Sequence, residues 1–324
     1  MTTARPPLKT LITVDTEIWC WGWRNIDSKF KKAFTKYIYG TTARGDWGLP
    51  FLFRHLADNN INAVFFIEAL FAVRFGVKYL KMIVNMIHDA GHFVELHLHP
   101  EWADEANVPL INTKEKKQYL CQFTLDEQIV LISKGVELMH KAGVDNIHAF
   151  RAGSFGANND TLKALKAVGI NCDSSFNSVI GPSELKLHNQ PLQPLLVDGL
   201  LEVPMTTFTD GIGRPRQAAV TACSFNELHD TLNNAYYKGW ETYVILTHSF
   251  EFLNNRLNRH NPIVADRFIQ LCRFLGENKT KYVTCGFNGI QPTANGVKFD
   301  RISCNASSTV VRLKEQIQSR LMIL

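Results

Sequence analysis

The sequence has no uninterrupted apolar run that approaches the roughly 20 residues needed by a membrane-spanning helix. Its first ten residues carry charges, and no apolar segment of signal-peptide length follows them. From these two absences we expect a cytoplasmic protein with no integral membrane segment.

Closely paired cysteines, which bind metals or build disulfide frameworks, are also missing. The sequence has seven cysteines, and none of them forms a C-x-x-C pair. Because they are odd in number, widely spaced and for the most part within apolar stretches, we expect buried, reduced thiols.

The sequence has no strong charge bias either. Its formal net charge is +5, and the lysines and arginines are scattered along most of the chain. This mild positive charge favours anionic ligands but lacks the clustered basic patch of a nucleic-acid-binding protein. We therefore expect no nucleic-acid partner.

What the sequence does contain is a regular alternation of predicted strands and helices. The two alternate about seven times at spacings that suit parallel βα units. No repeat, low-complexity tract or linker divides the chain. The alternation predicts a single barrel-like α/β domain over residues 1–324, with its core at residues 10–290 and a helical extension at residues 291–324.

Some local features of this pattern are specific enough to test. Residues 18–45 read as a long connection that holds seven aromatic side chains. Long connections are often functional, and these side chains either stack on a sugar or a lipid or cap the domain. Asp46 is expected to cap a helix that reaches about residue 58. The tail is expected to end in a helix over residues 310–324.

Residues 91–102 contain an unusual strand. Side chains alternate between the two faces of a strand, so His97 and His99 share one face and apolar residues share the other. Successive side chains on one face lie roughly 6.6 Å apart, which lets both imidazoles reach one ion. Pro100 ends the strand and so places the histidines at its carboxyl end, where parallel α/β folds keep their chemistry.

Polar side chains also lie at the ends of other predicted strands. Asp15 and Glu17 end one of them, and Arg151 and His248 end two more. Because the carboxyl ends of parallel strands meet at one edge, we expect these side chains to converge with the two histidines. Carboxylates and imidazoles together form a nitrogen and oxygen ligand set typical of a catalytic zinc or another divalent ion.

The remaining polar groups suit amide hydrolysis, which needs a base and an acid. Asp15 is the candidate base and His248 the candidate acid, and Arg151 is positioned to hold Asp15 ionised through a bidentate contact. Taken singly, each also has a structural explanation: a loop carboxylate, a core histidine or a surface ion pair. Their shared location at strand ends favours the catalytic interpretation.

Several neighbours have weaker claims to a role in the site. Glu101 and Trp102 follow the histidines, although a helix start and a packing role explain them as well. Phe250 and Glu251 follow His248 and are expected to line the pocket. Five further histidines have no partner at ligand spacing and are expected to be structural; they are His55, His88, His92, His140 and His148.

Several short motifs occur in a fixed order along the chain. They are TVDTE (13–17), GH (91–92) running into HLHP (97–100), FRAGSFG (150–156), CDSS (172–175), EVP (202–204) and LTH (246–248). This ordered set resembles the polysaccharide deacetylase family with the NodB homology domain, over roughly residues 10–290. The resemblance implies a distorted (β/α)₇ barrel, a divalent metal ion, usually zinc, and hydrolytic removal of an N- or O-acyl group from a sugar.

The resemblance assigns roles position by position. Asp15 matches the family's catalytic base, and His248 matches its catalytic acid. His97 and His99 match the metal-binding histidines, and Arg151 matches the arginine that steadies the base. In the CDSS motif, an aspartate resembles a family position near the substrate, although turn formation also explains it.

Two departures from the family pattern bear on the metal. The first motif usually has two adjacent aspartates, the second of them a metal ligand, and here Thr16 takes that second position. Glu17 is the natural replacement, or Asp15 itself moves onto the metal. The two histidines are usually separated by three residues, whereas here one residue lies between them, which changes the ligand geometry.

The resulting hypothesis is a metal-dependent carbohydrate deacetylase in glycan biosynthesis. It would remove an acyl group, N-acetyl in the first instance, from an amino sugar or a glycan precursor. Two alternatives stay open. One is hydrolysis of another C–N bond, such as a formamide or a cyclic amide. The other is a catalytically silent glycan-binding barrel, because the missing aspartate is compatible with an inactive member.

Overall fold

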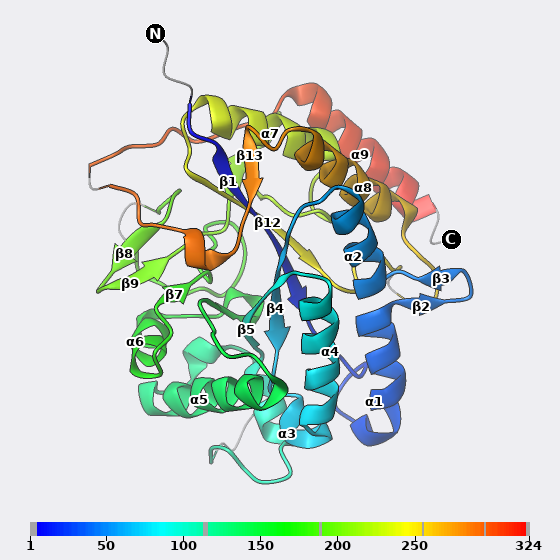
Figure 1. Cartoon of the computed structure of the whole chain (residues 1–324), viewed down its shortest axis with the longest axis vertical. Coiled ribbons are helices and arrows are strands. Elements are labelled where there is room, and N and C mark those ends of the chain that lie inside the picture. The colour runs from blue at the N-terminus through cyan, green and yellow to red at the C-terminus, as the bar shows by residue number, and fades with distance from the viewer. Residues whose placement is uncertain (1–4, 113–115, 188–189, 255, 295, 322–324) are drawn as a thin grey trace. The chain divides into compact units, whose positions relative to one another are not determined.

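The computed structural model describes residues 5–112, 116–187, 190–254, 256–294 and 296–321. Strands and helices alternate along the chain (Figure 1), which confirms the predicted α/β class. Contacts divide the chain into two compact units: a first unit of residues 1–63, 206–285 and 296–324, and a second unit of residues 64–205 and 286–295. The single domain over residues 1–324 stays a prediction.

Parallel strands form the sheet of the first unit. Strand β1 (Leu8–Thr16) lies between β12 (Thr242–His248) and β13 (Tyr282–Thr284). Nearly all of β1 is buried, as expected for a parallel strand that is covered on both faces. The register pairs Asp15 with His248, so the predicted base and the predicted acid end neighbouring strands.

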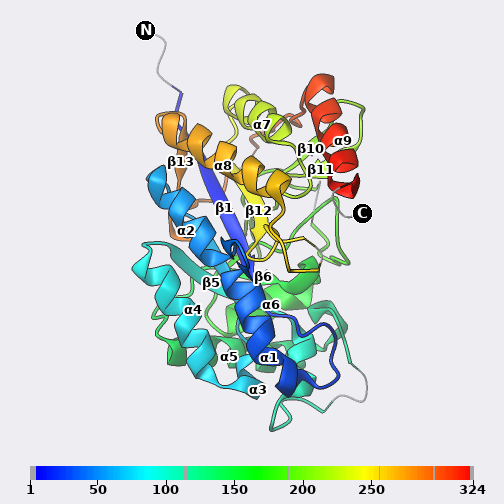
Figure 2. The same ribbon diagram turned by 90° about the vertical axis from the view of Figure 1, so that its right-hand side faces the viewer.

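Amphipathic helices and two short hairpins complete the first unit. Helices α7, α8 and α9 lie side by side in both views (Figures 1 and 2). On α9, Arg312 donates hydrogen bonds to the buried carboxylates of Asp210 and Glu227, at 2.8 Å and 3.0 Å. The helices are α1 (Ile26–Phe34), α2 (Leu49–Asp58), α7 (Phe225–Tyr237), α8 (Pro262–Glu277) and α9 (Ala306–Leu321), and the hairpins pair β2 (Thr41–Thr42) with β3 (Gly45–Asp46) and β10 (Thr207–Thr209) with β11 (Pro215–Gln217).

The second unit is a mainly parallel sheet with helices packed along it. Strand β8 alone among its described strands pairs antiparallel, with β9. Helix α5 packs between α4 and α6 (Figure 1). The parallel strands, in sheet order, are β4 (Val64–Glu68), β5 (Phe93–Leu98), β6 (Phe150–Ala152), β7 (Cys172–Asp173) and β9 (Leu200–Glu202), with β8 (Leu195–Val197) at the edge; the helices are α3 (Ala72–Phe75), α4 (Val77–Asp89), α5 (Leu125–Ala142) and α6 (Asn159–Ala167).

Helix α5 shows which face of β5 is apolar. A Cβ atom on Gly135 would lie 3.1 Å from Leu96 Cδ1 and 3.6 Å from Leu98 Cδ1, so the missing side chain lets the helix approach the strand. Leu96 and Leu98 therefore face α5. Alternation then directs His97 to the opposite face, as the sequence predicts.

Three local predictions need correction. Residues 18–45 are not one irregular connection, because residues 26–34 form α1, whose buried face includes Ile26 and Phe30. Asp46 does not cap α2; it pairs in β3, and Gly48 precedes the helix. The tail helix begins at Ala306 rather than at residue 310, and residues 322–324 of the predicted helix lie outside the described residues.

Each of the described helices is too short or too polar to cross a membrane.

Candidate active site

Asp15 and Glu17 lie at the carboxyl end of β1 and are both buried, with 3% and 6% of their surface exposed. Thr16, between them, directs its hydroxyl to the backbone oxygen of Val14 at 3.3 Å. The residue that stands where the resemblance implies a second aspartate therefore bonds to the backbone of its own strand.

His248 ends β12 and is fixed by a neighbouring carboxylate. Its Nδ1 lies 2.9 Å from Glu251 Oε1, and its backbone N–H donates to Glu251 Oε2 at 2.9 Å. Its other ring nitrogen, Nε2, lies 3.8 Å from Glu17 Oε1. Glu251 therefore sets the orientation of the ring and directs Nε2 toward the end of β1.

The charges around His248 keep its ring protonated. Burial alone would lower the pKa of His248, but the negative charges of Glu251, Glu17 and Asp15 outweigh burial and raise that pKa to about 10. A histidine that is protonated at neutral pH can serve as a general acid.

Asp15, Glu17 and His248 form one group of potential metal ligands, because each offers a ligand atom within 4.8 Å of the other two. The orientation of Glu17 in this group is supported by Trp19, whose Nε1 donates a hydrogen bond to Glu17 Oε2 at 2.7 Å. Sequence analysis did not identify Trp19 as a partner of this carboxylate.

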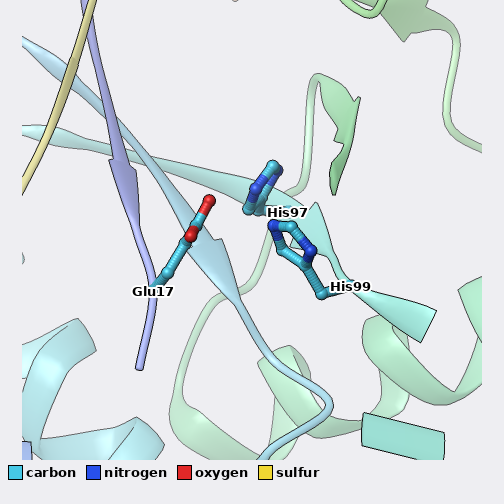
Figure 3. A group of neighbouring side chains, drawn as sticks. All are labelled: Glu17, His97 and His99. Carbon is cyan, nitrogen blue, oxygen red and sulfur yellow. The ribbon is translucent and has the colours of Figure 1, made fainter. Parts of the chain in front are cut away.

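In the second unit, His97 and His99 lie at the carboxyl end of β5 with 1% and 4% of their surface exposed. Figure 3 shows their rings next to each other, with centroids 4.9 Å apart and planes at 80°. His97 Nδ1 lies 2.8 Å from the carbonyl oxygen of Arg151. Since a carbonyl only accepts hydrogen bonds, Nδ1 carries the proton and Nε2 is left with the lone pair that a metal ligand needs.

His99 is held by two acidic residues. Its backbone N–H donates to a carboxylate oxygen of Glu68, and its Nδ1 lies 3.5 Å from Glu101 Oε2. Burial raises the pKa of Glu68 to about 8. Glu101 thus contacts the site, whereas Trp102 is fully buried and packs edge-on against Phe75, as a structural residue does.

Glu68 was missed by the sequence analysis. The signal that could have found it is an acidic residue at the end of the buried strand 64–68, the same pattern that singled out Asp15 and Glu17.

The fold requires a glycine at position 153, because a Cβ atom there would lie 2.6 Å from His99 Nδ1. Any other residue at position 153 would collide with the His99 imidazole in its present position.

Arg151 is fully buried in the second unit. Its Nε donates to the carbonyl oxygen of Ser174 at 3.2 Å, and its guanidinium carbon lies 4.3 Å from the centre of the Phe66 ring. These contacts fix the guanidinium firmly. The bidentate contact between Arg151 and Asp15 that the sequence analysis expects stays a prediction.

Asp173 and Glu202 form a buried pair of carboxyl groups. They are register neighbours on β7 and β9, and neither side chain is exposed to solvent. Asp173 Oδ1 accepts from the Ser175 hydroxyl and Glu202 Oε1 from the backbone N–H of Phe176. Asp173 Oδ2 and Glu202 Oε2 have no other partner among the described residues, and a proton held between them satisfies both.

This pair makes stability depend on pH. Burial, together with the charge of Asp173, raises the pKa of Glu202 well above its usual 4.5. The folded chain therefore keeps a proton that the unfolded chain releases above about pH 4.5, so the contribution to stability is complete below that pH and is lost as pH rises toward the folded pKa. For Glu202→Gln, whose amide can donate a hydrogen bond to Asp173, we expect a smaller loss of stability as the pH rises.

Urea unfolding at pH 5 and pH 8 measures this effect. The free energy of unfolding should fall more steeply with pH in the unmodified chain than in Glu202→Gln, by up to about 1.4 kcal/mol per pH unit for one proton. Ser183→Ala, which changes no ionisable group, should keep the steeper slope. Equal slopes for the unmodified chain and Glu202→Gln would show that no proton is shared.

The histidines expected to be structural have local partners where the contacts are clear. His140 Nδ1 lies 2.8 Å from the carbonyl oxygen of Val144, and His148 Nδ1 lies 3.4 Å from a carboxylate oxygen of Glu95. Within the described residues, neither potential metal-binding group includes any of these five histidines.

No protein-family model matches the chain, and no curated protein matches it. Its structure is similar to a crystal structure described as a polysaccharide deacetylase from Mycobacterium smegmatis. That match has 15% sequence identity and a TM-score of 0.54 and covers 91% of this chain and 96% of the other.

Two further structures match with lower scores. One is a family 4 carbohydrate esterase from Streptomyces lividans in complex with acetate, at 12% identity and a TM-score of 0.43, covering 90% of this chain and all of the other (100%). The other is a CE4 family pseudoenzyme from Bacillus anthracis, at 13% identity and a TM-score of 0.43, covering 87% of this chain and 65% of the other. The Mycobacterium smegmatis match confirms the predicted barrel-like α/β fold: the chain has the fold of a polysaccharide deacetylase structure.

Proposed function

We propose that the chain is a metal-dependent hydrolase that removes an acyl group, N-acetyl in the first instance, from an amino sugar or a glycan precursor. The observation that supports it most is the group of Asp15, Glu17 and His248 in the first unit, whose ligand atoms lie within 4.8 Å of one another. In the second unit, His97 and His99 place two buried imidazoles next to each other (Figure 3). The proposal is that these two sets of residues share one metal ion.

The donor set fits a divalent first-row metal ion such as zinc. His97 presents an unprotonated Nε2, and Glu17 supplies a carboxylate oxygen. Two imidazoles and one carboxylate leave a coordination position open for water or substrate, as catalytic sites do. In this arrangement Glu17 would take over the ligand role of the missing aspartate, and Asp15 would be a further candidate ligand.

When bound, the ion supplies Lewis acidity, which lowers the pKa of water and polarises an acyl carbonyl. Asp15 removes a proton from the attacking water as general base. His248 protonates the leaving nitrogen from Nε2, because Glu251 occupies Nδ1. Arg151 holds Asp15 in its ionised form, as the resemblance implies.

These groups suit the amide of an N-acylated amino sugar better than the ester of an O-acylated sugar. The leaving nitrogen of an amide must be protonated, and the protonated His248 is available to do this. The deacetylase fold adds support for an acylated sugar as substrate class.

The test is a metal analysis of the purified protein followed by an assay of acyl release. We expect about one equivalent of a first-row divalent ion, consistent with a single catalytic site. We also expect acetate release from acetylated amino sugars that stops with a chelator and returns with zinc. Formylated amines and cyclic amides serve as comparison substrates.

Two results would refute the proposal. Metal content that stays negligible after zinc is added would favour the silent glycan-binding barrel. Faster turnover of a formyl or cyclic-amide substrate than of every acetylated sugar would favour the other C–N hydrolase.

A further inference from the structure

Helix α9 has its polar side buried and an apolar side exposed, which is the reverse of an ordinary surface helix. Ser308, Thr309 and Arg312 on its inner side are only 5%, 0% and 4% exposed. The Thr309 hydroxyl and Nε of Arg312 both donate to Glu227 Oε1, at 2.9 Å and 3.0 Å. Polar contacts therefore hold α9 on the first unit.

The solvent-facing side of α9 carries a row of aliphatic side chains. Val310, Leu313 and Ile317 are 46%, 40% and 59% exposed. Because they follow one another at intervals of three and four residues, they lie on one side of the helix and form what we call the α9 stripe. In both views α9 is the outermost of the three helices α7, α8 and α9 (Figures 1 and 2). Single exposed apolar residues are ordinary, but a row of three on a helix whose polar side is buried indicates a binding surface.

The charge beside the α9 stripe is positive. Lys314 is exposed and lies one turn of the helix from both Val310 and Ile317. Glu315 is the sole acidic residue in the sequence of α9, and its carboxylate binds the guanidinium of Arg267 at 2.7 Å. The acidic charge of the helix is therefore neutralised within the first unit, and a basic charge is left at the surface.

The turn of the β10–β11 hairpin extends this surface. It packs against the amino-terminal part of α9, where the Gly211 N–H donates to the Thr309 hydroxyl at 2.9 Å. In the same turn, 54% of the Ile212 surface is exposed, and Arg214 is exposed as well. The turn thus adds one aliphatic and one basic side chain at the amino-terminal end of the helix.

We propose that the α9 stripe docks on the surface of a membrane that contains anionic lipids. The aliphatic side chains of the stripe would lie at the boundary between headgroups and acyl chains. Lys314 and Arg214 would lie near the lipid phosphates. The helix would stay attached to its unit through its buried polar side, so that it lies in the plane of the membrane surface. This inference does not rest on the proposed function.

The size and the charge of this surface favour a membrane over a second copy of the chain. Three half-exposed aliphatic side chains offer on the order of 300 Å² of apolar area, so two copies paired through the stripe would bury less than the roughly 1,000 Å² of a specific interface. In a symmetric pair the same patch meets itself, so Lys314 and Arg214 would face their own positive charges. An anionic lipid surface attracts both of them.

Co-sedimentation of the full chain with lipid vesicles tests the proposal. With vesicles of phosphatidylcholine and about 30% phosphatidylglycerol, we expect half of the protein to be bound at about 1 mM lipid, which is about tenfold weaker than binding through one myristoyl chain. Vesicles of phosphatidylcholine alone should bind at least about tenfold less protein. Salt at about 0.5 M should weaken binding to the anionic vesicles, because it screens the basic side chains.

Variants of the stripe separate its aliphatic contribution from its charge. Val310→Ser should weaken binding to the anionic vesicles about three- to fivefold, and the double variant Leu313→Ser with Ile317→Ser at least about tenfold, because each change removes partly exposed apolar surface. Lys314→Gln should weaken binding about fivefold at low salt and should have little effect at high salt. Val130→Ser is the matched control, since Val130 is a valine on helix α5 of the second unit with a similar exposed fraction, 44%. It should bind as the unmodified chain does.

Three results would overturn the proposal. One is that the unmodified chain does not bind the anionic vesicles at millimolar lipid. Another is that Val310→Ser and Val130→Ser bind equally well, with thermal unfolding showing that both are folded. The third is a dimer of the unmodified chain, measured by light scattering, that the double variant converts to a monomer, because the stripe would then be covered by a second copy of the chain.

Discussion

Replacing His248 with alanine is expected to lower kcat/KM for an acetylated amino sugar by about 10²- to 10⁴-fold, the usual contribution of a general acid. His248 is the protonated group that ends β12 beside Asp15, and Glu251 fixes its orientation. Steady-state kinetics with the metal-loaded protein measure the loss. Metal content should remain near that of the unmodified chain if His248 acts as the acid rather than as a ligand.

Glu251→Gln separates the acid role from a structural one. The carboxylate of Glu251 is the largest of the charges that raise the pKa of His248, so its removal should lower that pKa. Because the acid must be protonated, the basic limb of the pH–rate profile should move to lower pH. His229→Ala, on α7, should change neither the pKa of His248 nor the basic limb of the pH–rate profile. If His248→Ala kept more than about a tenth of the activity, it would not be the general acid.

Replacing His97 with alanine is expected to remove the metal ion. His97 offers one of the few potential ligands, and its tautomer is already set for binding through Nε2. Loss of a ligand from a site of three or four should reduce bound metal from about one equivalent to below about a tenth. Activity should fall with it. Metal analysis after dialysis against chelator-treated buffer measures the change.

Gly153→Ala gives a graded version of the same test. The added methyl group would displace the His99 ring, which a Cβ atom would approach to 2.6 Å, without removing any ligand. A shift in ligand orientation typically weakens metal binding by about 10- to 100-fold. His140→Ala, at the far end of α5, should bind metal normally. Full metal content in both His97→Ala and Gly153→Ala would exclude this site as the metal centre.

The parts of the site that the sequence predicts are those governed by short-range patterns. Alternation along β5 and the proline after it are sufficient to place His97 and His99 together at a strand end. In the same way, the apolar runs of β1 and β12 place Asp15 and His248 at strand ends, and the register then pairs them. Residue order along the chain carries this information directly.

The contacts of Glu202 and Glu68 depend on which strands become neighbours in the sheet. No local sequence pattern predicts the order of the strands. Glu202 meets Asp173 only because β9 pairs with β7, after an excursion that includes β8. Glu68, at the end of β4, accepts a hydrogen bond from the backbone N–H of His99, which follows the neighbouring parallel strand β5. The sequence analysis missed helix α1 for another reason. It interpreted the aromatic residues of this segment as side chains that either stack on a ligand or cap the domain, and not as one face of an amphipathic helix.

Helix α9 brings a consequence for how far the chain can be shortened. Arg312 neutralises two carboxylates that have no access to solvent, so a chain that stopped before this helix would leave Asp210 and Glu227 as buried negative charges without a counter-ion. It would also lose Gln316, which lines the same cavity as Trp21, Tyr37 and Phe250. Removal of the final helix would therefore destabilise the unit to which it belongs and open the wall of this cavity.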